Sequence, residues 1–437
     1  LSDDGKLLFL LGEVRGLDET ENRKWAALSY YRQAMLARAR FGMDRLNSYS
    51  GLYHAGGERP LQEELKDYNP WELEDDETLA LVGGHIRKVT LPDQFDVLKL
   101  LRSVKEDYVG SGVADQAWYG VGLYYQTRQQ YTRALDEYRA LRQAEREKKW
   151  ADQAKTQIDR ILAPQVRINN PGVQLPGRPA RLQLSYRNTE KVWFVAREID
   201  VKGFLGEFRA NVVDGKQNWQ WSLRQWHRYF MRSREKRHND HWIYRSAAEH
   251  VGKEVARWAD QVEDDGTHRY ARATLQTPLK ERGAYLVYCY QNEPPEGDAG
   301  KSGMELLTRG NSRAVTVLTD LAIVEKKTGD GNLYYVADAA GGSPVPRADV
   351  SILEVWHERV KKGNGSTYIY KKKIHDLRTG EQGMVMFGED AAAGGNGGLE
   401  SEVQQRAIPV QNPAHPGSSR SGRLHLLVST EDGRLAW

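Results

Sequence analysis

The sequence predicts an α+β multidomain chain, with an N-terminal α-helical part followed by two antiparallel β-sandwiches. At roughly 100 to 200 residues per domain, its 437 residues are enough for two to four domains. Before Pro164, apolar residues recur in steps of three and four, as in amphipathic helices. After Pro164, short alternating segments are separated by Gly- and Pro-rich joints, as in sandwiches. The expected domains are 1–163, 164–317 and 318–437.

Four segments of the first domain have helical spacing. In the first of them, Trp25, Leu28, Tyr31 and Met35 recur on one face. Pro164 ends the last one, because proline cannot continue a helix. The four expected helical segments are 21–46, 93–108, 117–141 (a helical pair) and 150–162.

The segment 117–141 resembles a tetratricopeptide repeat. Small residues at Gly122 and Ala134 would let two antiparallel helices approach closely. A looser echo spans 8–31. These two repeats are fewer than the roughly three that a free solenoid needs, so we expect the helical part to lean on a neighbour or on a segment outside this chain. The residues at the motif's spacing are Trp118, Val121, Gly122, Tyr125, Ala134 and Tyr138.

The remaining chain is predicted to be stranded, with the joint between the two sandwiches near Leu318–Leu321. Asp330-Gly331 separates two strand-like segments and indicates a hairpin. The expected strands are 180–186, 191–199, 284–290, 314–327, 333–338, 348–356, 366–374 and 423–429.

Two stretches after Pro164 contain distinctive strand and turn patterns. Residues 318–354 contain a strand, a hairpin and the pattern V-x-D-A-x-x-G-x-P-V-x-x-A-x-V, and they resemble the opening segment of a macroglobulin domain of the bacterial alpha-2-macroglobulin family. Residues 176–200 and 279–289 are similar to strands of the family's first macroglobulin domain. The resemblance covers about 165–437 and implies macroglobulin-like sandwiches. The pattern residues are Val336, Asp338, Ala339, Gly342, Pro344, Val345, Ala348 and Val350.

Cys289 is the only cysteine, so an intramolecular disulfide and a multi-cysteine zinc site are excluded. The family's thioester joins a Cys to a Gln three residues later, in a C-x-E-Q run. Here Gln291 follows Cys289 at the wrong offset, and no Glu lies between them. Cys289 is therefore expected to be a buried structural thiol.

The stretch 218–242 interleaves aromatic and basic residues. Trp219, Leu223, Trp226 and Phe230 share one helical face. We interpret the stretch as a helical insertion, about 219–262, that packs on the first sandwich, with a second helix at 246–262. The alternative is a partner-binding surface. Nucleic acid is disfavoured, since 63 basic residues nearly balance 60 acidic ones. The candidate interaction residues are Arg224, Arg228, Arg232 and Trp242.

Recognised catalytic motifs are absent from the sequence. The grouping of His238, Asp240 and His241 has no recognised metal-ligand spacing, 82–89 is interpreted as a turn, and the lysines of 371–375 are interpreted as protecting a sheet edge. We therefore expect no enzyme, no cofactor and no metal.

The expected role is that of a structural or interaction fragment within a longer protein. The resemblance implies a parent that traps or inhibits proteases, or serves envelope defence, outside the cytoplasm. Its partners would be proteases or envelope proteins, without nucleic acid or membrane insertion. The alternative is a cell-surface adhesion or recognition module for a protein or glycan.

Overall fold

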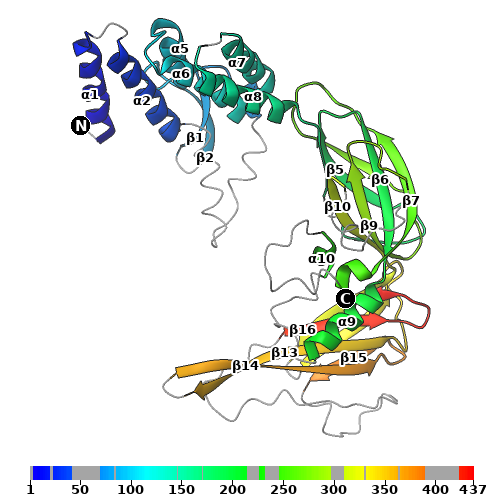
Figure 1. The fold of residues 1–437 in the computed structure, drawn as a ribbon. Helices are drawn as coiled ribbons and strands as arrows, with labels where there is room; N and C mark the ends of the chain where they lie inside the picture. The colour runs from blue at the N-terminus through cyan, green and yellow to red at the C-terminus, as the bar shows by residue number, and fades with distance from the viewer. Residues whose placement is uncertain are drawn as a thin grey trace. The chain divides into compact units, whose positions relative to one another are not determined.

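The computed structural model describes the chain as two compact units (Figure 1). Unit 1 comprises Leu1–Pro164 with Asp264–Tyr270, and unit 2 comprises Gln165–Glu263 with Ala271–Trp437. Together they make a mixed helix-and-sheet, multidomain α+β chain with several antiparallel sheets. The residues described are 3–19, 23–41, 69–82, 85–144, 146–169, 171–213, 226–231, 246–296, 310–328, 331–362, 365–388 and 423–437.

Unit 1 is built mainly from helices that pack on their neighbours along the chain. Asp96 caps the N-terminus of α5 by accepting a hydrogen bond from the backbone N–H of Lys99 at 3.0 Å. The helical segments are α1 (Asp3–Leu17), α2 (Lys24–Phe41), the 3₁₀ turn η3 (Pro70–Glu72), α5 (Val97–Asp107), α6 (Ala114–Thr127), α7 (Tyr131–Gln143) and α8 (Lys148–Leu162).

Helices α6 and α7 approach closely at Gly122. A Cβ at this position would lie 2.5 Å from Cε1 of Tyr138, so only glycine fits without displacing the ring. The close approach expected at Gly122 is therefore present, whereas the assignment to a tetratricopeptide repeat stays a prediction. Helix α1 buries none of its residues, and its Phe9 and Leu17 are 60% and 77% exposed.

A β-hairpin interrupts the helices of unit 1. Strands β1 (Glu77–Val82) and β2 (His85–Thr90) pair antiparallel, with Glu77 opposite Thr90. The interpretation of 82–89 as a turn was wrong for Val82, which ends β1, and for residues 85–89, which belong to β2; residues 83 and 84 lie outside the described residues. Ile86 is buried between the exposed residues His85 and Arg87, as expected where one face of a strand is covered.

The first half of unit 2 is a two-sheet sandwich. One sheet has the order β4-β10-β9-β6-β7 and the other β3-β5-β8; β4 and β10 pair parallel, and the other described pairs are antiparallel. Side chains from both sheets fill the core, among them Leu184 of β5 and Phe194 of β6. The strands are β3 (Gln165–Asn169), β4 (Val173–Gln174), β5 (Arg181–Arg187), β6 (Lys191–Ile199), β7 (Val251–Gln261), β8 (Ala271–Gln276), β9 (Gly283–Tyr290) and β10 (Ser312–Leu318).

The helical insertion lies earlier than expected. Within the described residues it consists of α9 (Val201–Val213), α10 (His227–Met231) and a helical turn at 246–249. The helix expected at 246–262 was wrong, since β7 occupies most of it. Pairing with β6 and stacking of Trp258 on Phe194, with ring centroids 5.1 Å apart, outweigh the helix-like local spacing.

The second half of unit 2 is another two-sheet sandwich. The sheets have the orders β11-β12-β15 and β14-β13-β16-β17, and residues such as Val336 and Ile352 fill the space between them. The predicted hairpin is confirmed, with Thr328 of β11 opposite Gly331 of β12. Strand β14, which carries the lysines of 371–375, lies at a sheet edge. The strands are β11 (Leu321–Thr328), β12 (Gly331–Asp338), β13 (Asp349–Lys362), β14 (Gly365–Arg378), β15 (Met384–Gly388), β16 (Arg423–Ser429) and β17 (Leu435–Ala436).

Candidate interaction site

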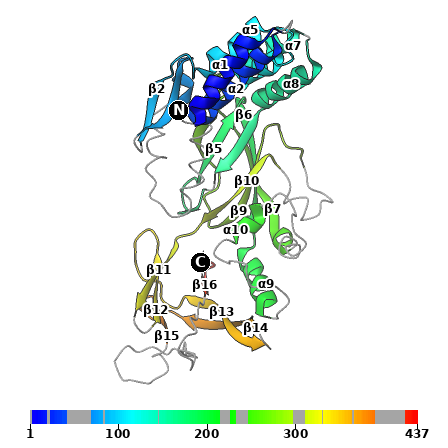
Figure 2. The same ribbon diagram turned by 90° about the vertical axis from the view of Figure 1, so that its left-hand side faces the viewer.

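The described aromatic residues of the tryptophan face, Trp226 and Phe230, are part of the protein core. Trp226 and Phe230 are both 0% exposed and contact each other edge-to-face, with ring centroids 5.7 Å apart. The ring of Phe204 in α9 packs on that of Phe230, with centroids 5.0 Å apart, and the ring of Trp437 packs on that of Trp226, with centroids 5.2 Å apart. Figure 2 shows α9 alongside β14, and their residues are in contact. The cluster therefore joins the insertion to both sandwiches of unit 2.

The basic residues of this stretch are not placed by the structure. Arg224, Arg232 and Trp242 lie outside the described residues, as do Trp219 and the group of His238, Asp240 and His241. Arg228 lies in α10, where the structure describes its backbone but not its side chain. The candidate surface of Arg224, Arg228, Arg232 and Trp242 therefore stays a prediction.

A cluster of polar side chains connects the two ends of the insertion, the start of α9 and the helical turn before β7. His250 lies between two carboxylates, with Nδ1 3.3 Å from Asp200 and Nε2 3.1 Å from Glu207. Ser246 Oγ donates to Glu207 at 2.8 Å rather than to His250, so the cluster lacks an activated serine nucleophile. Across the described part of the chain, no group of three or more His, Cys, Asp or Glu is arranged to hold a metal ion.

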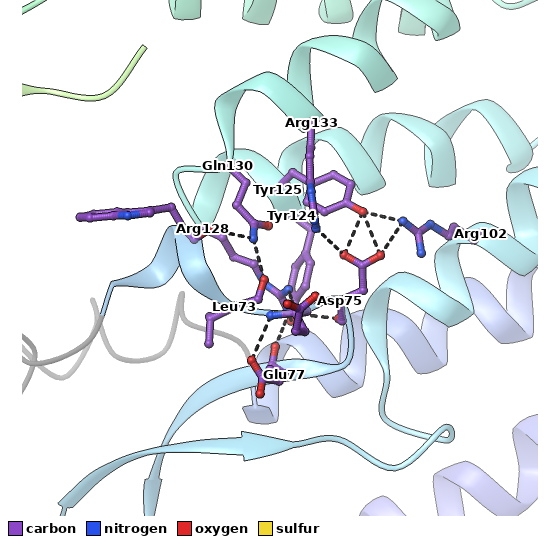
Figure 3. A network of polar contacts seen from close by, with 11 residues as sticks. Leu73, Asp75, Glu77, Arg102, Tyr124, Tyr125, Arg128, Gln130 and Arg133 are labelled. Atoms are coloured by element: carbon purple, nitrogen blue, oxygen red, sulfur yellow. Dashed lines mark hydrogen bonds and ion pairs between the residues drawn. The ribbon is translucent and has the colours of Figure 1, made fainter. Parts of the chain in front are cut away.

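The acidic segment 72–77 forms a polar network with α5, α6 and α7 (Figure 3). The carboxylate of Asp75 accepts hydrogen bonds from Arg102 at 2.9 Å, Arg133 at 3.0 Å and the Tyr125 hydroxyl at 3.1 Å. Burial, with the nearby carboxylate of Asp75 adding to it, raises the pKa of Tyr125 to about 12. Because Asp75 already has three donors, this network is a structural anchor.

Arg128 holds the backbone of the same segment from the turn between α6 and α7 (Figure 3). Its side chain is 1% exposed, and its guanidinium donates to the carbonyls of Glu74 at 2.8 Å and Glu77 at 2.5 Å. Gln130 adds a bond to the Leu73 carbonyl at 2.7 Å. Gln129, between them, has φ +59, and this left-handed residue turns the chain between the two helices. The sequence contains the acidic run at 72–77, but it does not reveal the partners of this run on the helices.

A pocket of about 110 Å³ lies on the β4-β10-β9-β6-β7 sheet, on the face turned away from the β3-β5-β8 sheet. Four residues on the neighbouring strands β10, β9, β6 and β7 pair directly across the sheet, in the order Arg313, Tyr288, Val195 and Arg257. Val195 is the short side chain among long ones, and the pocket forms around it. Its lining residues are Val195, Arg197, Glu254, Arg257, Tyr288, Tyr290, Pro294 and Pro295.

A β-bulge builds one wall of this pocket. Residues three apart in a regular strand point to opposite faces, but Ala196 pairs with Ala256 and Arg197 pairs with Glu254, so Val255 is an extra residue. Glu254 thereby shares a face with Arg257, and the two side chains form a bidentate pair at 2.9 and 3.0 Å. The hydrogen bonds that Arg257 donates to Glu254 raise the pKa of Arg257.

Loop and strand contacts fix the remaining polar groups of the pocket. Arg257 donates from Nη1 to the Pro294 carbonyl at 3.0 Å, which ties the loop after β9 to the wall. Arg197, 6% exposed, donates to the Gly252 carbonyl at 2.9 Å. Sequence reasoning missed this pocket, because its residues come from three strands and a loop.

Cys289 faces the core of the first sandwich and is 0% exposed. Burial strongly raises the pKa of its thiol, which disfavours the reactive thiolate. Its strand neighbours across the sheet are Phe194 and Ser312. The side chain is thus a buried structural thiol, as the sequence predicts.

Solved structures similar to this chain are fragments or whole molecules of bacterial alpha-2-macroglobulins. A crystal structure of the Escherichia coli protein spanning domains NIE-MG1 is 12% identical and covers 63% of this chain and 95% of its own, with a TM-score of 0.30. An Escherichia coli fragment spanning domains MG0-NIE-MG1 is 11% identical. The match covers 52% of this chain and 64% of the fragment, with a TM-score of 0.26. Salmonella alpha-2-macroglobulin reacted with methylamine is 11% identical. The match covers 52% of this chain and 12% of the Salmonella chain, with a TM-score of 0.25.

No protein-family model and no curated protein matches the sequence. The described helices include none that is both long and apolar enough to cross a membrane.

Proposed function

We propose that this chain is a non-catalytic structural and interaction module of an alpha-2-macroglobulin-like protein that traps proteases or serves envelope defence outside the cytoplasm. The sequence motif at the start of the second sandwich carries the proposal, together with the turn that it forms. Asp338 accepts hydrogen bonds from the backbone N–H groups of Ala340 at 3.0 Å and Gly341 at 2.8 Å. The N–H of Val345 donates to the carbonyl of Val336 at 2.9 Å and closes the turn.

These contacts explain why the pattern needs its residue types. The aspartate organises the loop by accepting from the backbone, as turn aspartates do. Gly342 has φ +71, a left-handed conformation that favours glycine. The turn therefore sets the path from β12 to β13, and Asp338 and Gly342 of the sequence pattern help to form it.

The chemistry of the chain supports a role without catalysis. Cys289 lies in the core with its pKa raised by burial, at a site where no thioester Gln follows at the required offset. Arg102 and Arg133 both bind the carboxylate of Asp75. The longer protein would then act on proteases by enclosing them physically, without a catalytic step of its own in this chain.

The test is gel filtration of the protein that carries this chain, mixed with active or active-site-blocked proteases. Trapping requires cleavage, so we expect active trypsin to co-elute and blocked trypsin to elute alone. Equal co-elution of the two forms would instead support docking without cleavage. Absence of co-elution across a panel of active proteases would refute trapping.

The alternative role, a recognition module for a protein, has one observation in its favour. The pocket around Val195 has tyrosine, proline and arginine walls, and tyrosine and arginine are enriched in protein-binding hot spots. Binding of a protein segment there would be independent of protease activity.

A further inference from the structure

We propose that the outer face of the β3-β5-β8 sheet binds an acidic polysaccharide, with Arg167, Arg181 and Arg272 pairing with its carboxylates. The outer face is the side of this sheet that is turned away from the sandwich core. The inference goes beyond the proposed protease-trapping role and is independent of it.

Alternation along the strands separates the two sides of the sheet. Leu182 and Leu184 of β5 are buried in the core, whereas Arg181 and Gln183 are exposed. Strands β3 and β8 alternate in the same way. Cross-strand pairing aligns the outward residues in three rows. These rows are Arg167, Ser185 and Arg272; Asn169, Gln183 and Thr274; and Arg181 with Gln276.

The outer face is basic and carries no negative charge. Strands β3, β5 and β8 contain no Asp or Glu, although acidic residues nearly equal basic ones in the whole chain. Arg167, Arg181 and Arg272 are exposed, and none of their guanidinium groups has a hydrogen bond or an ion pair with a described residue. A guanidinium is a planar fork of donors that matches a carboxylate. The face therefore offers three separate positions for carboxylates.

The spacing of the arginines favours a polymer over a single small anion. Arg167 and Arg272 pair with Ser185 from opposite sides, so their Cα atoms lie about 10 Å apart. Arg181 lies about 13 Å from Ser185 along β5. A ligand that carries anionic groups at intervals along its length can meet all three.

A pocket of about 250 Å³ lies at the Arg181 end of the outer face. The side chain of Gln174 braces it, because it donates to the carbonyl of Arg181 and accepts from the N–H of Arg181, both at 2.8 Å. Arg178 and Arg181 therefore give this end a second pair of cationic groups without a carboxylate between them. The lining residues are Gln174, Leu175, Arg178, Pro179 and Arg181.

The uncharged residues of the outer face distinguish a sugar polymer from other polyanions. The outward positions hold no aromatic residue, so the stacking platform of single-stranded nucleic acid is missing. They hold no apolar side chain to insert into a membrane or to anchor a protein interface. Gln183, Thr274 and Gln276 are exposed and can both donate and accept, as sugar hydroxyls require.

The experiment measures binding of the whole chain to biotinylated polygalacturonate by biolayer interferometry at low ionic strength. Fully methyl-esterified polygalacturonate has the same sugar backbone without the charge, and poly-L-glutamate has carboxylates without the sugar. We expect saturable binding to polygalacturonate that weakens as salt is added, no binding to the ester, and weaker binding to poly-L-glutamate.

Two triple variants with the same loss of charge test the location. Replacing Arg167, Arg181 and Arg272 with glutamine should weaken polygalacturonate binding by about tenfold or more. Replacing the exposed Lys253, Lys326 and Lys327 with glutamine, on β7 and β11, should weaken it by less than about threefold. The pair Gln183→Ala and Gln276→Ala keeps the charge and should weaken polygalacturonate binding by about threefold or more.

Four results would overturn the proposal. They are no saturable binding of polygalacturonate, equal binding of its methyl ester, equal losses in the two triple variants, and binding of poly-L-glutamate as tight as that of polygalacturonate, which would indicate an acidic protein instead. Circular dichroism would verify that the variants are folded. If the arginine triple variant is not folded, Arg272→Gln is compared with Lys253→Gln, and equal affinities of these two would likewise reject the site.

Discussion

Replacing Trp226 with alanine should strongly destabilise unit 2. Its side chain is 0% exposed and touches the rings of Phe230 and Trp437. Losing about 150 Å² of buried apolar area at about 25 cal/mol per Å² corresponds to roughly 4 kcal/mol. The indole Nε1 is buried without a hydrogen-bond partner among the described residues, so its removal returns a part of this cost. The expected loss is therefore about 3 to 5 kcal/mol.

The assay is urea unfolding followed by circular dichroism, with the midpoint and slope compared between variants. Trp25→Ala is the control, since Trp25 is 54% exposed and its loss should change stability by less than about 0.5 kcal/mol. A double-mutant cycle with Trp437→Ala should give a coupling energy of about 0.5 to 1.5 kcal/mol, as for contacting rings. An unchanged midpoint for Trp226→Ala would refute the packing interpretation and favour a binding surface.

Further predictions concern single residues in both units. Arg128→Met should cost about 2 to 4 kcal/mol, because two buried carbonyls lose their donor, and hydrogen exchange should report faster opening of β1 and β2; normal protection there would contradict the anchor. Gly122→Ala should cost about 1 to 3 kcal/mol through overpacking against Tyr138, whereas Gly12→Ala, with open space around it, should be neutral or stabilising in the same melts. Cys289 should resist iodoacetamide and labelled methylamine in the native state and react with iodoacetamide only after unfolding, which mass spectrometry would check; native incorporation of methylamine would contradict a structural thiol.

Strands whose pattern reflects their own burial were predictable from the sequence. Strand β6 has the predicted bounds 191–199, and β16 has the predicted bounds 423–429. Both are rich in β-branched or other apolar residues, and both lie inside sheets with neighbours on each side. The Asp330-Gly331 hairpin was also predictable, because its turn chemistry is local.

Elements decided by distant partners were not predictable. In 246–262, Val251, Val255, Trp258 and Val262 have helical spacing, yet the segment forms β7 because β6 offers an edge to pair with. The start of the hairpin of β1 and β2 is bound by Arg128, which lies some 50 residues further along the chain and donates to the carbonyls of Glu74 and of Glu77, the first residue of β1. A single sequence shows neither partner.

The pocket around Val195 was invisible for the same reason. Its central row depends on the register of four strands, and its charged wall depends on the bulge at Val255. The sequence directs attention instead to 218–242, where aromatic and basic residues lie close together along the chain. In the structure, the described aromatic residues of that stretch, Trp226 and Phe230, belong to the core.

The most direct test of the proposed role measures protease activity on two substrates of different size. The protein that carries this chain is mixed in molar excess with trypsin, elastase or subtilisin, and hydrolysis of casein and of a short chromogenic peptide is followed. Physical enclosure excludes large substrates and admits small ones, so casein hydrolysis should fall while peptide hydrolysis persists. Unchanged hydrolysis of both substrates by all three proteases, with the protein verified as folded, would contradict the account.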